Sequence, residues 1–274
     1  MYRIVKVLNN NALLVQNIKE KSESILLGKG IGFGRKNGDE IASKDGLKEY
    51  QLVAGDNRTS QIGTENGIEP VYLEAAGRII EEAEAVFKTI SSDILLPLAD
   101  HIAFAARRER EKIYVANPFI PDIKVLFGKE YAVALKSREI IKEMAGYEIS
   151  DDEAGFIALH IHSGLSHEQV SDTLKATQLI DDSMNMIVKA AGKPANTDSL
   201  TYTRLLSHLY YMIERTTKNI PVNIDLNTFM EATYPEAAGI AKDVCFYMEK
   251  KLNKPLDKLE IGYLGVHIQR YLVE

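Results

Sequence analysis

Two kinds of hydrophobic pattern follow one another along the chain. Up to about Leu52, short apolar segments at Tyr2–Leu8, Ala12–Gln16 and Ser24–Gly28 alternate with polar breaks rich in Asn and Gly. Such spacing is typical of short β-strands joined by tight turns. We therefore predict a small antiparallel β domain over residues 1–56.

Beyond Pro70 the periodicity changes. Apolar residues recur at Leu73, Ala76 and Ile80, at the intervals of three and four that place them on one face of a helix. The polar, glycine-containing stretch before them has no periodicity, which is typical of a linker. We predict a linker at 57–69 and a helical chain after it.

The helical part matches itself at a shift of 107 residues. His101 then falls on His208 and His160 on His267, so each copy holds two histidines 59 residues apart. Their neighbours match too: Ile102, Phe104 and Arg108 fall on Leu209, Tyr211 and Arg215, and Glu153, Gly155, Phe156, Ile157 and Ile161 fall on Glu260, Gly262, Tyr263, Leu264 and Ile268. We infer a duplicated helical domain, at 70–171 and 172–274.

Charge separates the two parts further. The net charge is −6, but residues 1–36 carry +5 and the remainder −11, so the β domain is basic.

The single cysteine, Cys245, cannot form an internal disulfide, and we expect it to pack in a core in a reducing, cytoplasmic setting. The sequence has no apolar run of about eighteen residues, so we expect neither a signal peptide nor membrane insertion.

A glycine-rich segment, Gly28–Gly34, invites a nucleotide-binding interpretation, but it fits neither the dinucleotide fingerprint nor the Walker pattern. Glycine occupies every second position. On an extended strand, one face would carry no side chains while Lys29, Ile31, Phe33 and Arg35 project from the other.

Positive charge from Lys6 and Lys29, with Phe33 as an aromatic face for a base, makes RNA the partner to propose for this face. The alternative is a sheet with solvated lysines and a phenylalanine in the core.

The duplication selects four of the six histidines. His162 and His167 align with Gln269 and Glu274, whereas the other four occupy equivalent places in the two copies. Neutral imidazole is a good nucleophile near neutral pH, and phosphorylation would add close to two negative charges. Each pair could act as an electrostatic switch, although a histidine beside apolar residues is more often a core side chain.

Metal binding is the competing interpretation for His160 and His162. On a helix, residues two apart point roughly 200° apart, and no HExxH motif or cysteine pair accompanies them. We therefore expect no metal site, no catalytic residues and no enzymatic activity.

Several segments together carry a family likeness. They are Val7–Asn11, Gly28–Lys36, Asp100–Ala105, Asn117–Phe119 and Gly155–His162. In this order they make the whole chain resemble the BglG/SacY family of bacterial transcriptional antiterminators, most closely its glucose-responsive branch. The resemblance implies a multidomain fold: a small antiparallel β RNA-binding domain followed by two all-α helical-bundle regulatory domains of the phosphotransferase system.

The resemblance also implies the partners and site residues. A homodimer would bind a hairpin in leader RNA and prevent a terminator from forming ahead of sugar-transport genes, without a cofactor. The implied RNA contacts are Lys6, Asn11, Gly28, Lys29, Gly30 and Phe33, and the implied phosphate acceptors are His101, His160, His208 and His267. A sugar-specific transporter component would modify the first regulatory domain, and the phosphocarrier protein the second. A second hypothesis is a regulator whose β domain docks to a protein instead of RNA.

Overall fold

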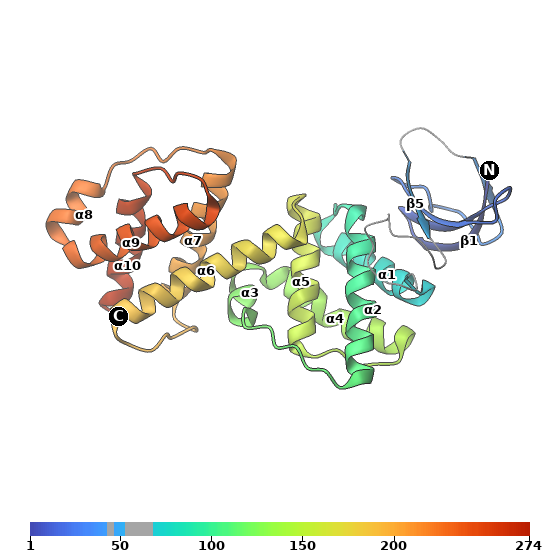
Figure 1. The fold of residues 1–274 in the computed structure, drawn as a ribbon, viewed down its shortest axis with the longest axis horizontal. Helices are drawn as coiled ribbons and strands as arrows, with labels where there is room; N and C mark the ends of the chain where they lie inside the picture. The colour runs from blue at the N-terminus through green and yellow to red at the C-terminus, as the bar shows by residue number, and fades with distance from the viewer. Residues whose placement is uncertain (43–46, 53–67) are drawn as a thin grey trace. The chain divides into compact units, whose positions relative to one another are not determined.

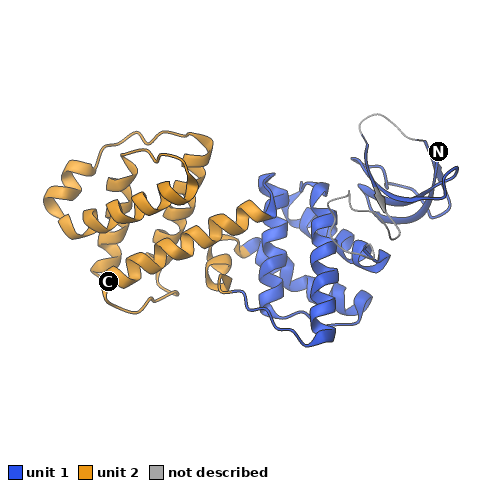
Figure 2. Ribbon diagram, viewed as in Figure 1, with its two compact units in different colours: residues 1–117, 129–170 blue, residues 118–128, 171–274 orange. Residues whose placement is uncertain are grey.

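The computed structural model describes residues 1–42, 47–52 and 68–274. A small β-sheet is followed by helices (Figure 1). The chain divides into two compact units, Met1–Asn117 with Lys129–Val170, and Pro118–Gly128 with Ser171–Glu274 (Figure 2). The proposed linker at 57–69 lies almost wholly outside the described residues.

The sheet is antiparallel, with strand order β4-β1-β2-β3-β5. Its strands are β1 (Tyr2–Asn9), β2 (Ala12–Asn17), β3 (Glu23–Leu27), β4 (Glu40–Ile41) and β5 (Lys48–Leu52). Asn10 and Asn11 form the two-residue connection between β1 and β2, which suits a tight hairpin. Apolar side chains form the core of the sheet, namely Tyr2, Ile4, Leu13, Val15, Leu26 and Ile41. The predicted antiparallel β fold is confirmed, while the predicted boundary at residue 56 lies outside the described residues.

The expectation that Gly28–Gly34 is an extended strand is wrong. Strand β3 ends at Leu27, and the backbone then folds into successive turns. Gly30 and Gly34 have φ of +69° and +71°, values that only glycine adopts readily. A Cβ on Gly32 would lie 2.2 Å from the carbonyl oxygen of Asn9, so this glycine allows a close backbone approach. The glycines build a loop rather than a bare strand face.

Helices of the first unit follow the predicted periodicity. They are α1 (Pro70–Phe87), the short 3-10 helix η1 (Ser92–Ile94), α2 (Leu95–Glu111), α4 (Gly128–Ala145) and α5 (Asp151–Ser166). Proline at the first position starts α1, where its missing N–H costs nothing. The predicted face of α1 is confirmed, because Leu73, Ala76 and Ile80 are all buried.

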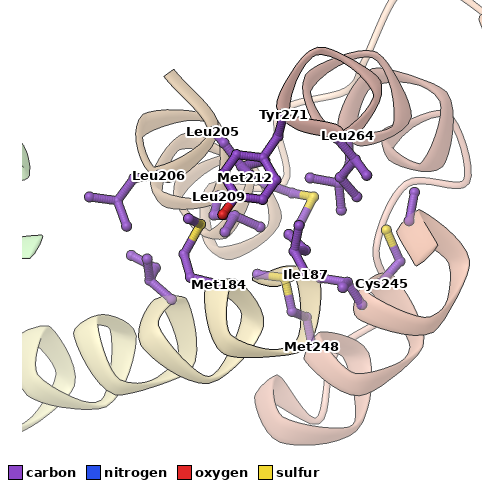
Figure 3. Close-up of a cluster of buried hydrophobic side chains, with 14 of the residues drawn as sticks. Met184, Ile187, Leu205, Leu206, Leu209, Met212, Cys245, Met248, Leu264 and Tyr271 are labelled. Atoms are coloured by element: carbon purple, nitrogen blue, oxygen red, sulfur yellow. The ribbon is translucent and has the colours of Figure 1, made fainter. Parts of the chain in front are cut away.

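The second unit contains α3 (Ile120–Leu126), α6 (Val170–Ala191), α7 (Leu200–Lys218), α8 (Asn227–Thr233), α9 (Pro235–Leu252) and α10 (Glu260–Leu272). Its helices enclose one apolar core, in which Met184, Leu205, Met212 and Tyr271 meet (Figure 3). Cys245 lies in this core with 4% of its surface exposed, as predicted. Burial raises the pKa of its thiol to about 12.

The duplication extends to the helix boundaries. Both ends of α8 lie 107 residues after those of α3, and α9 ends 107 residues after α4. The neighbours of these two short helices nevertheless differ: α8 packs against α9 and α10, whereas α3 packs against α7. There the Tyr202 hydroxyl donates to Asp122 over 3.3 Å, and Phe127 meets the Tyr210 ring edge-on. In the described part of the chain, no helix has the length and apolar character needed to cross a membrane.

Two glycines of the second unit provide a matched test of this packing. A Cβ on Gly262 would lie 2.7 Å from the carbonyl carbon of Leu226, whereas one on Gly239 would meet nothing within 4 Å. We expect Gly239→Ala to stabilise the protein by about 0.5–1 kcal/mol through helix propensity. Gly262→Ala should destabilise it by about 1–3 kcal/mol, because backbone must shift. Calorimetry of the full chain measures both, and shifts of the same sign would contradict the crowding at Gly262.

Candidate functional site

The first histidine pair lies between helices α2 and α5. His101 on α2 and His160 on α5 face each other with ring centroids 5.1 Å apart and planes tilted by 45°. Phe156, one turn before His160, lies 5.9 Å from the His101 ring. His160 is buried and the His101 side chain is 15% exposed. Residues 59 positions apart in the sequence thus meet in one site.

A glutamate and an arginine complete this site. Glu153, in the first turn of α5, places Oε2 3.0 Å from His101 Nε2 and accepts a hydrogen bond over 2.5 Å at Oε1 from Arg108 Nη2. The Arg108 guanidinium also lies over the Phe104 ring, 4.6 Å from its centroid. The backbone position of Glu153 is fixed by the helix cap, because Ser150 Oγ accepts from its N–H.

The second pair repeats the arrangement between α7 and α10. The ring centroids of His208 and His267 are 4.4 Å apart. Arg215 donates to both oxygens of Glu260, over 2.7 and 2.8 Å, and the glutamate side chain is 1% exposed. His208 Nε2 lies 3.9 Å from the same carboxylate, beyond hydrogen-bond distance. The structure therefore brings each predicted pair together and places a glutamate and an arginine beside it.

Burial keeps most of these rings neutral. It holds the pKa of His160 well below 6.5, and the neighbouring charge of His101 lowers it further. For His208, burial and then the charges of His267 and Arg215 lower the pKa to about 3. Burial also lowers the pKa of His267, with Arg270 and Arg204 adding to the effect. Neutral imidazoles retain the lone pair that a nucleophile needs.

Glu153 behaves differently from an isolated buried acid. Burial alone would raise its pKa, but the contacts with His101 and Arg108 outweigh that effect, and the pKa stays below 4.5. Sequence reasoning matched Glu153 with Glu260 but did not select them as site residues. The signal was present, because both are polar residues at equivalent positions of the repeat.

The two remaining histidines lie outside the pairs. His162 Nδ1 is 3.0 Å from Glu130 Oε1, so it faces α4 while His160 faces α2. His167 is exposed at the C-terminal end of α5, where it has φ of +60°. Among the described residues, no group of three His, Cys, Asp or Glu side chains could hold a metal ion.

The candidate RNA-binding loop is organised by Asn11. Its carbonyl oxygen accepts from the Gly28 N–H over 2.9 Å, and its side-chain Oδ1 accepts from the Gly30 N–H over 2.8 Å. The loop leaves Lys29 exposed and Phe33 78% exposed. Phe33 is therefore no core residue, and the structure excludes that alternative.

Two of the six predicted RNA contacts touch helix α1. The Lys6 ammonium pairs with Glu74, and Asn11 Nδ2 donates to Glu84 over 3.0 Å. The backbones are close as well, because a Cβ on Gly77 would lie 2.6 Å from the Leu8 carbonyl oxygen. In this conformation Lys6 and Asn11 have acidic partners, while Lys29 and Phe33 project into solvent.

Two protein families match parts of this chain. Residues 2–59 match the CAT RNA binding domain family, and residues 77–164 and 182–271 match the PRD domain family. The GlcA/glcB genes antiterminator of Staphylococcus carnosus is 28% identical over 98% of this chain and 96% of its own length. The PtsGHI operon antiterminator of Bacillus subtilis is 30% identical with the same coverage.

Transcription antiterminator LicT of Bacillus subtilis is 28% identical, with 98% of each chain covered. A crystal structure of GlcT CAT-PRDI is 31% identical and covers 60% of this chain and 98% of that chain, with a TM-score of 0.39. An RNA-binding domain followed by two PRD domains defines a regulator of transcription and not an enzyme. The chain belongs to the family of transcription antiterminators built from these domains, which confirms the resemblance found in the sequence.

The low pKa of His208 makes stability depend on pH. Its folded pKa of about 3 lies below its ordinary 6.5, so only the unfolded chain gains a proton as the pH falls from 7 to 5. The contribution of His208 to the free energy of unfolding is therefore fully present above pH 6.5 and decreases as the pH falls below it. The loss is about 2 kcal/mol at pH 5. His208→Gln should reduce this loss in urea unfolding at the two pH values. His167→Gln, at an exposed histidine, is the control, and an unchanged loss in His208→Gln would contradict the assignment.

Proposed function

We propose that the β domain binds a hairpin in a leader transcript, which prevents an overlapping terminator hairpin from forming. Sugar-transport genes downstream are then transcribed. The observation that carries this proposal is the loop 28–34, in which Phe33 is 78% exposed and Lys29 is exposed as well. Relatives named for the glcA/glcB genes and the ptsGHI operon support the same role.

Each proposed contact has a physical role. Lys29 meets a phosphate, Phe33 stacks on a base, and the open backbone at Gly30 lets RNA approach closely. Gly28 starts the loop, where its N–H donates to Asn11 and Leu47 fills the space beside it. Lys6 and Asn11 complete the surface; on binding they exchange the carboxylates of α1 for groups of the RNA.

Control comes from phosphorylation at His101, His160, His208 and His267. The proposed donors are a sugar-specific component of the phosphotransferase system for the first PRD domain and the phosphocarrier protein for the second. The first modification inhibits and the second activates. Buried neutral rings support this role, because they keep a nucleophilic nitrogen near neutral pH.

A homodimer working in the cytoplasm connects the two activities. Phe104 and Tyr211, at equivalent positions one turn after His101 and His208, are 53% and 58% exposed. A second copy would cover such aromatic rings, and RNA binding would then depend on how the copies pair. Phosphate charges added beside the rings would alter that pairing.

RNA contacts should respond to mutation in two distinct ways. Phe33→Ala should weaken binding of the full chain to a leader hairpin by about 1–3 kcal/mol, because a stacking surface is lost. Lys29→Ala should reduce the salt dependence of binding by about one released counterion. Fluorescence anisotropy across a salt series measures both quantities.

Lys19→Ala is the matched control for charge. Lys19 is an exposed lysine in the turn between β2 and β3, at the opposite end of that hairpin from loop 28–34. It should bind like the unmodified protein. A Phe33→Ala variant with full affinity would contradict the loop assignment, and failure to bind any leader hairpin would favour a protein-docking role.

Phosphorylation can be mapped directly. We expect incubation with the phosphotransferase components to place acid-labile phosphate on the four paired histidines, read by mass spectrometry under neutral conditions. Single His→Ala variants should each lose their own label. Label confined to His162 or His167 would show that the wrong histidines had been assigned.

A further inference from the structure

The two PRD domains hold the same four groups in two different arrangements. In the first, Glu153 is shared: one oxygen lies 3.0 Å from His101 Nε2 and the other accepts from Arg108 Nη2. In the second, Glu260 is bound by two hydrogen bonds from Arg215 and lies 3.9 Å from His208 Nε2. The carboxylate therefore has two positions relative to the histidine, and the arginine is its partner in both.

Arg108 has capacity for another acceptor. The residue is 9% exposed, and its Nε is buried with no hydrogen-bond partner among the described residues. A guanidinium presents its donors in a planar fork that fits two oxygens of a phosphate or carboxylate. Glu153 uses only one arm of that fork. A buried cation beside the reactive ring, with a donor unused, is suited to receive an anion that arrives on His101.

We infer that Glu153 occupies, in the unmodified protein, the place that the phosphoryl group on His101 Nε2 takes, and that Arg108 then binds the phosphoryl oxygens. This inference rests on the proposed phosphorylation of His101. Arg108 is a positioning residue, since it acts on the modified ring without taking part in the transfer itself. By the repeat, Arg215 and Glu260 are the corresponding residues beside His208.

The transfer balances without a further reactant. The phosphorus bond to the donor protein's side chain breaks and its electron pair stays with that side chain, while Nε2 of His101 forms the new phosphorus–nitrogen bond. The proton that Nε2 carries while it faces the Glu153 carboxylate leaves this nitrogen as the carboxylate withdraws, and it passes to the donor's side chain. A phosphoryl dianion and the Glu153 carboxylate cannot share the site without strong repulsion, because like charges at such distances repel strongly where water is scarce. The carboxylate must leave the imidazole.

The displaced carboxylate has somewhere to go. Arg108 and Glu153 line a cleft of about 310 Å³ whose other walls include Ile113, Tyr147 and Ser150. Glu153 can turn toward this cleft and regain water without unwinding α5. Glu260 is less free to turn toward water, because it is 1% exposed and two nitrogens of Arg215 donate to its carboxylate. Its displacement should be slower.

The test measures two rates on the full chain, phosphorylated by the phosphotransferase components. Phosphate on His101 should be lost about tenfold faster from Arg108→Gln than from the protein without substitutions, because a charge-assisted contact is gone. Glu153→Gln should accept phosphate faster, since the competing anion is neutral, and should keep it at least as long. Arg107→Gln, at an exposed arginine of the same helix that pairs with Glu111, should change neither rate.

A spectroscopic readout separates this role from a structural one. Contact with Arg108 should hold the phosphoryl pKa, followed by the ³¹P shift, lower than in Arg108→Gln. The double variant Arg108→Gln/Glu153→Gln leaves no unpaired buried charge and keeps the test possible if the single variant does not fold. Equal lifetimes and equal phosphoryl pKa values with and without Arg108 would overturn the inference while leaving His101 phosphorylation intact. If the protein without substitutions takes up no phosphate on His101, the proposed function is overturned instead.

Glu260→Gln provides an internal comparison. Because both arms of Arg215 bind Glu260, neutralising this carboxylate should accelerate phosphorylation of His208 by a larger factor than Glu153→Gln accelerates that of His101. If Glu260→Gln accelerated phosphorylation of His208 by the smaller factor, displacement of the carboxylate would not be the step that limits phosphorylation.

Discussion

A buried glutamate–arginine pair is the interaction on which the geometry of each PRD domain depends. Arg108 with Glu153 joins α2 to α5, and Arg215 with Glu260 joins α7 to α10. A charge removed from water without a partner costs several kcal/mol, so the two helices must pack where the pair can close. That packing brings the histidine rings to 5.1 and 4.4 Å, and burial there lowers the pKa of His160 and of His208. The reactivity proposed for the rings thus follows from a structural contact.

Much of this organisation could be predicted from the sequence. The change of hydrophobic period marked the β domain and the helices, and the 107-residue repeat selected the paired histidines. The repeat succeeds because equivalent positions on equivalent helices meet equivalent neighbours. It was insufficient for α3, whose counterpart α8 packs against α9 and α10 while α3 packs against α7. A repeat specifies the local helix, but tertiary packing decides which surface covers it.

Other features were outside the reach of pattern reasoning. Alternating glycines at Gly28–Gly34 fit a strand period, but the positive φ of Gly30 and Gly34 is a property of the folded backbone that spacing alone does not reveal. The repeat matched Glu153 with Glu260, but this match alone did not mark Glu153 as a site residue. Acidic residues in the first turn of a helix usually lie at the surface and interact with the positive end of the helix dipole. The reach of Glu153 across to α2 depends on how two helices pack.

The β domain and the first PRD domain have one physical feature in common. Glu74 and Glu84 of α1 contact Lys6 and Asn11, and Glu153 contacts Arg108. In both places a carboxylate satisfies donors that are proposed to bind a phosphate-bearing ligand, which is RNA in one case and a modified histidine in the other. Buried or half-buried donors need a partner in the resting state, and a carboxylate is an anion that accepts from the same donors. The phosphoryl group on a histidine carries more negative charge than the carboxylate and can replace it. RNA phosphates carry one charge each, and RNA can replace the carboxylates by offering several phosphates at once. Both proposed sites are thus stable when empty and still receptive to their ligand.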